Sequence, residues 1–125
     1  MVVRFNHTIL PARDSGYTAH FTAEILGLTC RKTGVFHALD LADDATIDYV
    51  TAGEEAAYGH HVAFLVDDES FDAILARVRA KGIAYWADPH KHVEGEINCL
   101  YGGRGFYFDD PDGNHLEVMT VPYAK

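Results

Sequence analysis

The first half of the chain shows a hydrophobic pattern that predicts a strand, a helix and two further strands. Residues 2–10 form a short β-rich run, and the same kind of run returns around residues 35–41 and 46–51. Between them, Asp14 or Ser15 caps a predicted helix that ends before Gly27. Three apolar side chains are expected on one face of this helix: Tyr17, Phe21 and Ile25. Residues 52–59, rich in Gly, Ala and Glu, then predict a connector.

The second half begins the same pattern again. Residues 59–66 predict a strand, and a helix follows that Asp68 caps and Gly82 ends. Its apolar residues fall at helical spacing: Phe71, Ile74, Leu75 and Val78. Strands are predicted at residues 105–109 and 115–121, joined by the tight-turn sequence Asp-Pro-Asp-Gly.

The two halves also keep the same spacing between matching residues. His7 precedes Gly27 by 20 positions, and His61 precedes Gly82 by 21. Asp48 follows Gly27 by 21 positions, whereas Glu117 follows Gly82 by 35, so the second half carries about 14 extra residues. We place these extra residues in the segment 87–104.

The repeat predicts an α+β fold within a single domain, residues 1–125. Module one covers about residues 1–52 and module two about residues 59–125. Each module is expected to have βαβββ order, with curved mixed sheets around a metal or ligand cavity and the helices outside. Function is expected in that cavity.

Charge and composition exclude several classes of partner. The 125-residue chain has a formal net charge of −9, and its Lys and Arg occur singly or in pairs, so nucleic acid is not expected. No run of 18 apolar residues indicates a membrane span, and the N-terminus lacks a signal-peptide pattern. A cytoplasmic protein is therefore predicted. Cys30 and Cys99 fit neither a disulfide framework nor a CxxC site and are interpreted as structural thiols.

Strand alternation selects three residues for chemistry. In residues 60–66, Val62 and Phe64 should face the helices, which turns His61 into the cavity. His7 and Glu117 occupy corresponding positions on their own strands. Two imidazoles and a carboxylate hold a divalent transition metal, Fe, Ni, Co, Mn or Zn, with coordination positions left open. The alternative is a set of strand residues satisfied by neighbours, but their matching placement in two repeats favours the metal.

These residues lie within motifs that resemble the vicinal oxygen chelate superfamily. The motifs are Phe-Asn-His7-Thr, His61-Val-Ala-Phe, and Gly-Phe-Tyr-Phe-Asp-Asp-Pro-Asp-Gly-Asn-His-Leu-Glu117. That superfamily includes glyoxalase I, fosfomycin-resistance enzymes, extradiol dioxygenases and bleomycin-resistance proteins. The resemblance implies one metal per site on His7, His61 and Glu117, and a homodimer whose sites are built from one chain or two.

Two further residues gain roles from the same resemblance. Asp48 matches Glu117 in the repeat, and glyoxalase I-like members resemble this chain in having a fourth carboxylate there. We therefore regard Asp48 as a ligand, as a group that reaches the metal through water, or as a plain polar strand residue. Tyr107 resembles a tyrosine that binds a substrate oxygen or transfers a proton, and the alternative is a rim tyrosine between the core residues Phe106 and Phe108.

The extra segment, residues 87–104, predicts a loop that covers the site. It is too long and too polar for a simple hairpin. Arg104, His92 and Tyr101 are its candidate substrate-binding residues, together with Tyr107 from the following strand, and Arg104 is favoured because glycines flank it. The sequence Gly102-Gly-Arg-Gly105 is not a phosphate-binding loop, since no helix follows it.

Two functions remain open. The first is a metal-dependent enzyme, a lyase or isomerase or a dioxygenase, that acts on a small oxygen-rich substrate with Glu117 and Tyr107 as catalytic groups. Thiol transfer to fosfomycin ranks last because no cationic cluster suits a phosphonate. The alternative is a metal-free protein that sequesters a small molecule or an antibiotic.

Overall fold

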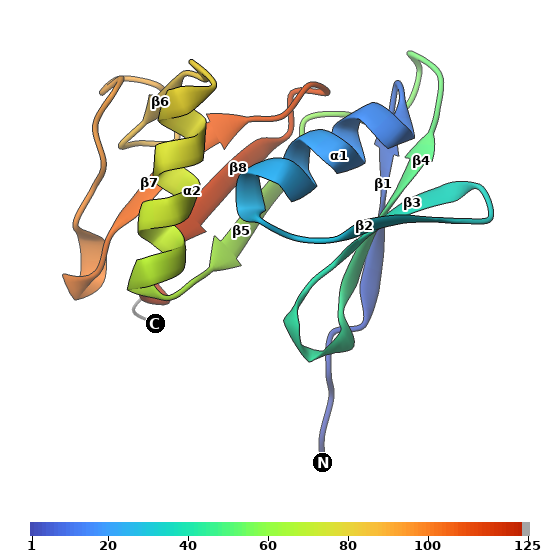
Figure 1. Cartoon of the computed structure of the whole chain (residues 1–125), viewed down its shortest axis with the longest axis horizontal. Coiled ribbons are helices and arrows are strands. Elements are labelled where there is room, and N and C mark those ends of the chain that lie inside the picture. The colour runs from blue at the N-terminus through green and yellow to red at the C-terminus, as the bar shows by residue number, and fades with distance from the viewer. Residues whose placement is uncertain (124–125) are drawn as a thin grey trace. The chain divides into compact units, whose positions relative to one another are not determined.

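The computed structural model describes residues 1–123, which form two compact units, one ending at Tyr58 and the other beginning at Gly59. Each unit is a βαβββ module with one helix and a four-stranded mixed sheet (Figure 1). The predicted α+β fold with two such modules is therefore confirmed. None of the helices in residues 1–123 is long and apolar enough to cross a bilayer.

The first unit has one helix and a four-stranded sheet. Its elements are β1 (His7–Ala12), α1 (Ser15–Leu26), β2 (Cys30–Thr33), β3 (Phe36–Asp40), a 3-10 turn η1 (Ala42–Asp44) and β4 (Thr46–Thr51). The strand order is β1-β4-β3-β2, with β1 parallel to β4 and the other pairs antiparallel. The edge strand β1 therefore lies beside the last strand of its own module.

The second unit repeats this topology. Its elements are β5 (His61–Leu65), α2 (Asp68–Ala80), β6 (Tyr85–Trp86), a 3-10 turn η2 (Leu100–Gly102), β7 (Gly105–Asp109) and β8 (His115–Met119). The order is β5-β8-β7-β6, and β5 is parallel to β8. The two modules therefore position the residues of β1 and β5 in the same way.

The predicted strands at residues 46–51 and 105–109 match β4 and β7, and those at 35–41, 59–66 and 115–121 extend one or two residues beyond β3, β5 and β8. The run predicted at residues 2–10 becomes a strand only at His7, because its pairing with β4 begins at Thr46. Residues 1–6 are exposed. Neither β2 nor β6 was predicted as a separate strand, since β2 is a largely exposed polar edge strand and β6 has two residues.

Helix α1 starts and stops as its sequence predicts but buries a different face. The carboxylate of Asp14 accepts a hydrogen bond from the backbone N–H of Tyr17, and Gly27 ends the helix with a positive φ of 72°. Tyr17 is 64% exposed, so the predicted face was wrong at this position. The buried face is made instead mainly of small residues, such as Ala19 and Ala23, which let the helix lie close to the sheet.

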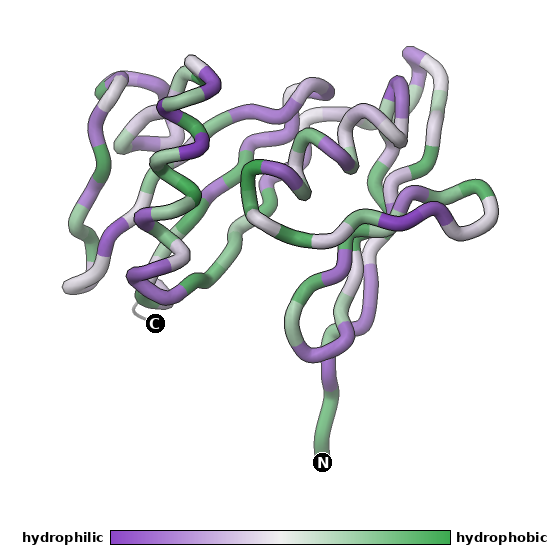
Figure 2. Tube along the Cα trace, viewed as in Figure 1, coloured by the Kyte–Doolittle hydropathy of each residue, from purple (hydrophilic) through white to green (hydrophobic). Residues whose placement is uncertain are grey.

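Helix α2 follows its predicted pattern closely. All four predicted apolar residues are buried, although the cap is Asp67 and not Asp68. Apolar and polar residues interleave along its turns (Figure 2). Phe71 packs edge-on against Phe106 of β7 with 5.4 Å between the ring centroids, and Tyr85 packs against the same ring at 5.7 Å. Aromatic packing therefore joins the helix to the face of the sheet that bears Phe106.

The turn before β8 fixes the register of the second sheet. Asp110 accepts hydrogen bonds from the backbone N–H groups of Asp112 and Asn114 and from the Asn114 amide. The amide oxygen of Asn114 in turn accepts from the backbone N–H of His60 at 2.9 Å. Burial raises the pKa of Asp110, although the Asn114 contacts oppose the shift. The turn therefore holds the start of β5 against β8.

We predict that Asn114→Ala lowers the free energy of unfolding by about 2 kcal/mol, because the buried carboxylate of Asp110 and the backbone N–H of His60 both lose a hydrogen-bond partner. Urea denaturation measures the change. Asn6→Ala is the matched control, since Asn6 is exposed and its side chain bonds to the neighbouring His7, and it should change stability by less than about 0.5 kcal/mol. Equal effects of the two variants would contradict this role for the turn.

Candidate metal-binding site

The register of the second sheet puts His61, Glu117 and Tyr107 on one face. Glu117 of β8 lies opposite Ala63 of β5 and Tyr107 of β7, while His61 lies opposite His115, two residues before Glu117. Residues that face each other across a ladder share a face, and alternate residues along a strand do so too. The opposite face carries the core residues Phe64, Phe106, Phe108, Leu116 and Val118. His61 therefore lies on the face opposite these core residues, as the strand alternation predicted.

Glu117 is the centre of a polar network on this face. Glu117 is only 2% exposed. Oε1 lies 3.1 Å from His61 Nε2, and Oε2 accepts a 2.5 Å hydrogen bond from the hydroxyl of Tyr123. The hydroxyl of Tyr107 lies 3.1 Å from that of Tyr123. The His61 side chain is 50% exposed, so solvent reaches the network on the imidazole side.

Both tyrosines remain protonated at neutral pH. Burial raises the pKa of Tyr107, and the neighbouring Glu117 carboxylate raises it further. Burial also raises the pKa of Tyr123, as do its hydrogen bonds to Glu117 and Tyr107. The network therefore has neutral phenols as hydrogen-bond donors beside one carboxylate.

The donor set fits a divalent metal. Burying a carboxylate is unfavourable unless a cation or hydrogen bonds compensate for its lost hydration. Here the compensation comes from a phenol and from an imidazole that is itself a ligand for transition metals. His61 and Glu117 are therefore suited to hold such an ion together.

The first sheet contains an equivalent pair, His7 and Asp48. His7 of β1 lies opposite Thr46 of β4, and Asp48 is two residues further along β4, opposite Ile9. This is the relation that His61 has to Glu117 in the second sheet. The two residues therefore share a face of the first sheet and match the pair in the second.

Neighbouring side chains form hydrogen bonds with both members of this pair. His7 Nδ1 lies 2.7 Å from the amide oxygen of Asn6 and donates to it, which leaves Nε2 as the imidazole nitrogen able to bind a metal. Asp48 is half-buried and accepts a hydrogen bond from the hydroxyl of Thr46 at 2.9 Å. Asp40 raises the pKa of Arg31 by hydrogen bonding and by charge, with a smaller contribution from Asp48. Asp48 therefore lies in a polar setting.

The predicted ligands form two pairs, one in each unit. In the part of the chain that the structure describes, no three His, Cys, Asp or Glu side chains gather closely enough to hold a metal. The pair His61 and Glu117 is in direct contact, while His7 and Asp48 share a sheet face. A metal site with all four predicted ligands would therefore need residues from both units.

Hydrogen bonds within the extra segment, residues 87–104, hold it in a defined conformation. The carboxylate of Asp88 accepts hydrogen bonds from the backbone N–H groups of His92 and Val93 at 2.9 and 2.8 Å. Burial acts to raise the pKa of Asp88, but these backbone contacts outweigh it and lower the pKa below its ordinary value. The Asn98 amide donates to the carbonyl oxygen of Ala87, which ties the later part of the loop to its first residue.

Of the three predicted substrate-binding residues in the loop, Tyr101 lies beside the Glu117 network, while His92 and Arg104 bind acidic side chains elsewhere. Tyr101 packs its ring 5.4 Å from that of Tyr123, beside the Glu117 network. His92 is 77% exposed on its side chain and lies near Asp88. Arg104 pairs instead with two carboxylates of α2, Asp68 at 3.0 Å and Asp72 at 2.7 Å. Contact between Arg104 and a substrate would require release of these ion pairs.

Lys91, a loop residue that could contact an anionic or phenolic substrate, lies against β7 and Trp86, whereas sequence reasoning missed Tyr123. Lys91 forms a 2.5 Å ion pair with Asp109, which also binds His115, and it lies 4.9 Å from the centre of the Trp86 ring. Tyr123 follows β8 after a short turn that carries no motif. Its proximity to Glu117 depends on the path of the chain after β8, which no local pattern encodes.

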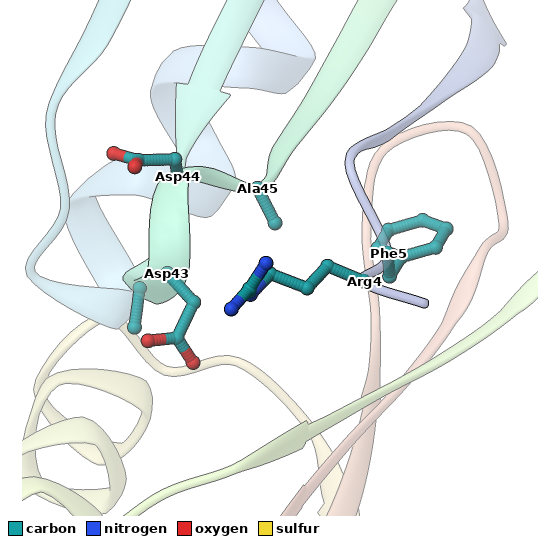
Figure 3. Close-up of a pocket in the computed structure, with 6 residues that line it drawn as sticks. Arg4, Phe5, Asp43, Asp44 and Ala45 are labelled. Atoms are coloured by element: carbon teal, nitrogen blue, oxygen red, sulfur yellow. The ribbon is translucent and has the colours of Figure 1, made fainter. Parts of the chain in front are cut away.

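A pocket of about 610 Å³ lies where the first sheet begins (Figure 3). Its lining residues are Arg4, Phe5, Ala42, Asp43, Asp44 and Ala45. The side chain of Arg4 extends toward the η1 turn. His7 follows Phe5 closely in the chain, but neither His7 nor Asp48 lines the pocket. We assign no ligand to it.

We predict that Asp88→Ala increases amide hydrogen exchange in residues 88–93, because two backbone N–H groups lose their acceptor. Hydrogen-exchange mass spectrometry measures the change. Glu96→Ala, which removes an exposed carboxylate from the same loop, should leave exchange in that stretch unchanged. Unchanged exchange in Asp88→Ala would show that the loop is held by other contacts.

Comparison with known proteins agrees with this fold. Residues 4–118 match the model of the glyoxalase/bleomycin resistance protein/dioxygenase superfamily. The chain is 32% identical to the glutathione transferase FosA of Serratia marcescens, in an alignment covering 99% of this chain and 85% of that protein. The structure of oxidase ChaP-H2 is similar over 100% of this chain and 98% of that one, with 43% identity and a TM-score of 0.95. Oxidase ChaP-H1 is similar at 42% identity, with 99% and 100% covered and a TM-score of 0.93.

The chain therefore belongs to the glyoxalase/bleomycin resistance protein/dioxygenase superfamily. The superfamily resemblance expected from the motifs around His7, His61 and Glu117 is confirmed. The three relatives named above are described as enzymes, two as oxidases and one as a transferase.

Proposed function

We propose that this protein is a divalent-metal-dependent enzyme that acts on a small, oxygen-rich molecule. One observation carries the proposal: a buried carboxylate, Glu117, contacts the imidazole of a half-exposed histidine, His61. Such a pair supplies two of the ligands that a catalytic metal needs and leaves access from solvent.

His61, Glu117 and His7 would hold the ion, and Asp48 would join them as a further ligand or through water. When bound, the metal supplies a Lewis acid that polarises the substrate oxygens. The tautomer that Asn6 imposes on His7 supports this assignment, since it presents Nε2. The matching positions of the two pairs in the two sheets also support it.

Tyr107 is the proposed proton-handling and substrate-binding group. Its hydroxyl shares the face of Glu117, and its ring centroid lies 6.3 Å from that of His61. As a neutral phenol it donates a hydrogen bond to a substrate oxygen and so stabilises negative charge that develops there. Glu117 is the candidate base for a reaction that begins with loss of a carbon-bound proton.

The reaction is proposed to be an oxidation of the dioxygenase type, with lyase or isomerase chemistry as the second candidate. Similarity to oxidases ChaP-H2 and ChaP-H1 at 43% and 42% identity over nearly the whole chain supports the first choice. The match to the transferase FosA is weaker, at 32% identity. Substrate oxygens next to each other would suit either chemistry, because both can approach one metal.

We also propose that the protein forms a homodimer with two metal sites. The pairs His7–Asp48 and His61–Glu117 belong to different units of the chain. A complete site therefore draws on both kinds of unit, from the same chain or from two chains.

We predict near-stoichiometric metal in the protein purified without chelators, and its loss in His61→Ala and Glu117→Gln. Each change removes a donor from the contacting pair. Mass spectrometry of bound transition metals gives the metal content per chain. His20→Ala is the matched control, because His20 lies on α1 and binds the carbonyl oxygen of Gly16, and it should retain metal. If the wild type binds no divalent ion even after reconstitution, the enzyme proposal fails and the ligand-sequestering alternative takes its place.

We predict that a mixture of His7→Ala and His61→Ala subunits recovers metal if each site combines units of two chains. A mixed dimer would then have one site with both histidines intact and one with neither. Subunits are exchanged by mild denaturation and refolding, and metal per dimer is measured after purification. Recovery of about half the wild-type metal per mixed dimer indicates shared sites, whereas none indicates sites within one chain.

A further inference from the structure

We propose that Tyr123 is a positioning residue that orients the Glu117 carboxylate for the metal. This inference rests on the metal site of the proposed function. The observation behind it is that the buried carboxylate is held from two sides, by Tyr123 on Oε2 and by His61 on Oε1.

The phenol of Tyr123 restricts the carboxylate to one orientation. Glu117 is buried, so water does not take the place of its hydrogen-bond donors. With Oε2 occupied by the phenol at 2.5 Å, Oε1 is directed at the imidazole of His61. A ligand that is already oriented loses less conformational entropy when an ion binds. Tyr123 therefore favours metal binding without contacting the ion.

Neighbouring tyrosines hold Tyr123 in turn. Its hydroxyl lies 3.1 Å from the hydroxyl of Tyr107, and its ring packs against that of Tyr101 with 5.4 Å between centroids. Tyr123 is still 41% exposed, so burial alone does not account for its position. The loop thus acts on the metal site through the ring of Tyr101.

Gly103 places the chain that carries Tyr123. The backbone N–H of Thr120 donates to the carbonyl oxygen of Arg104 at 3.0 Å, and the Arg104 N–H donates to the Thr120 hydroxyl at 2.9 Å. A Cβ atom on Gly103 would lie 2.6 Å from Val121 Cγ2. The φ of Gly103 is −116°, so its backbone suits other residues and only the close approach requires glycine. The absence of a side chain there lets residues 120–123 lie against the loop.

The first test is the cobalt(II) affinity of Tyr123→Phe, which removes the hydroxyl and keeps the ring. We expect binding weakened about 10- to 100-fold, as is usual when a partner of a metal ligand is lost. The visible absorption of bound cobalt should change as well, since it reports ligand geometry. Tyr17→Phe, the same change on the exposed surface of α1, is the matched control and should bind like the wild type.

The second test is Gly103→Ala, which leaves every proposed ligand and Tyr123 itself intact. The added methyl group must displace Val121, so cobalt affinity should fall about 10-fold while far-UV circular dichroism stays unchanged. Wild-type affinity and absorption in Tyr123→Phe would overturn the role of Tyr123, and wild-type affinity in Gly103→Ala would overturn its placement by Gly103. His61→Ala is assayed in parallel. If His61→Ala also binds like the wild type, the proposed metal site itself is wrong.

Discussion

The burial of one carboxylate organises the second half of this protein. Glu117 lies in the middle of β8 at 2% exposure, and an ionised group in that position needs donors or a cation to replace its water. The chain supplies an imidazole from the edge strand β5 and a phenol from the segment after β8. The parallel pairing of β5 with β8, the turn at Asp110 and the path of residues 120–123 all serve to bring these groups together.

The repeated βαβββ module explains how the first half of the chain could contribute ligands to the proposed metal site. The two modules share strand order and register, so a histidine at the start of each edge strand and an acid two places along the partner strand recur as His7 with Asp48 and His61 with Glu117. The second module adds a loop tied down by Asp88 and Asn98, and this loop packs Tyr101 against Tyr123. The insertion in the second module thus adds Tyr101 beside a network whose other members lie outside the loop.

Much of this arrangement could be predicted from the sequence, and the remainder has physical reasons. The alternation around His61 predicted its face, because a one-residue shift would have buried the imidazole among Phe64 and Val62. Local patterns could not give the partners of Arg104, which binds acids on α2 some 32 to 36 residues away, nor those of Tyr123. The exposed position of Tyr17 was also missed, since periodicity alone does not show that α1 packs through alanine and threonine.

The most direct measurement of the central claim is anomalous diffraction at the cobalt absorption edge from crystals grown with cobalt(II). The account predicts one strong peak per chain within coordination distance of His61 Nε2 and a carboxylate oxygen of Glu117, with the Tyr123 hydroxyl still bound to the carboxylate. A map with cobalt elsewhere, or with none while Glu117 keeps both of its present partners, would contradict the claim that this buried carboxylate exists to bind a metal.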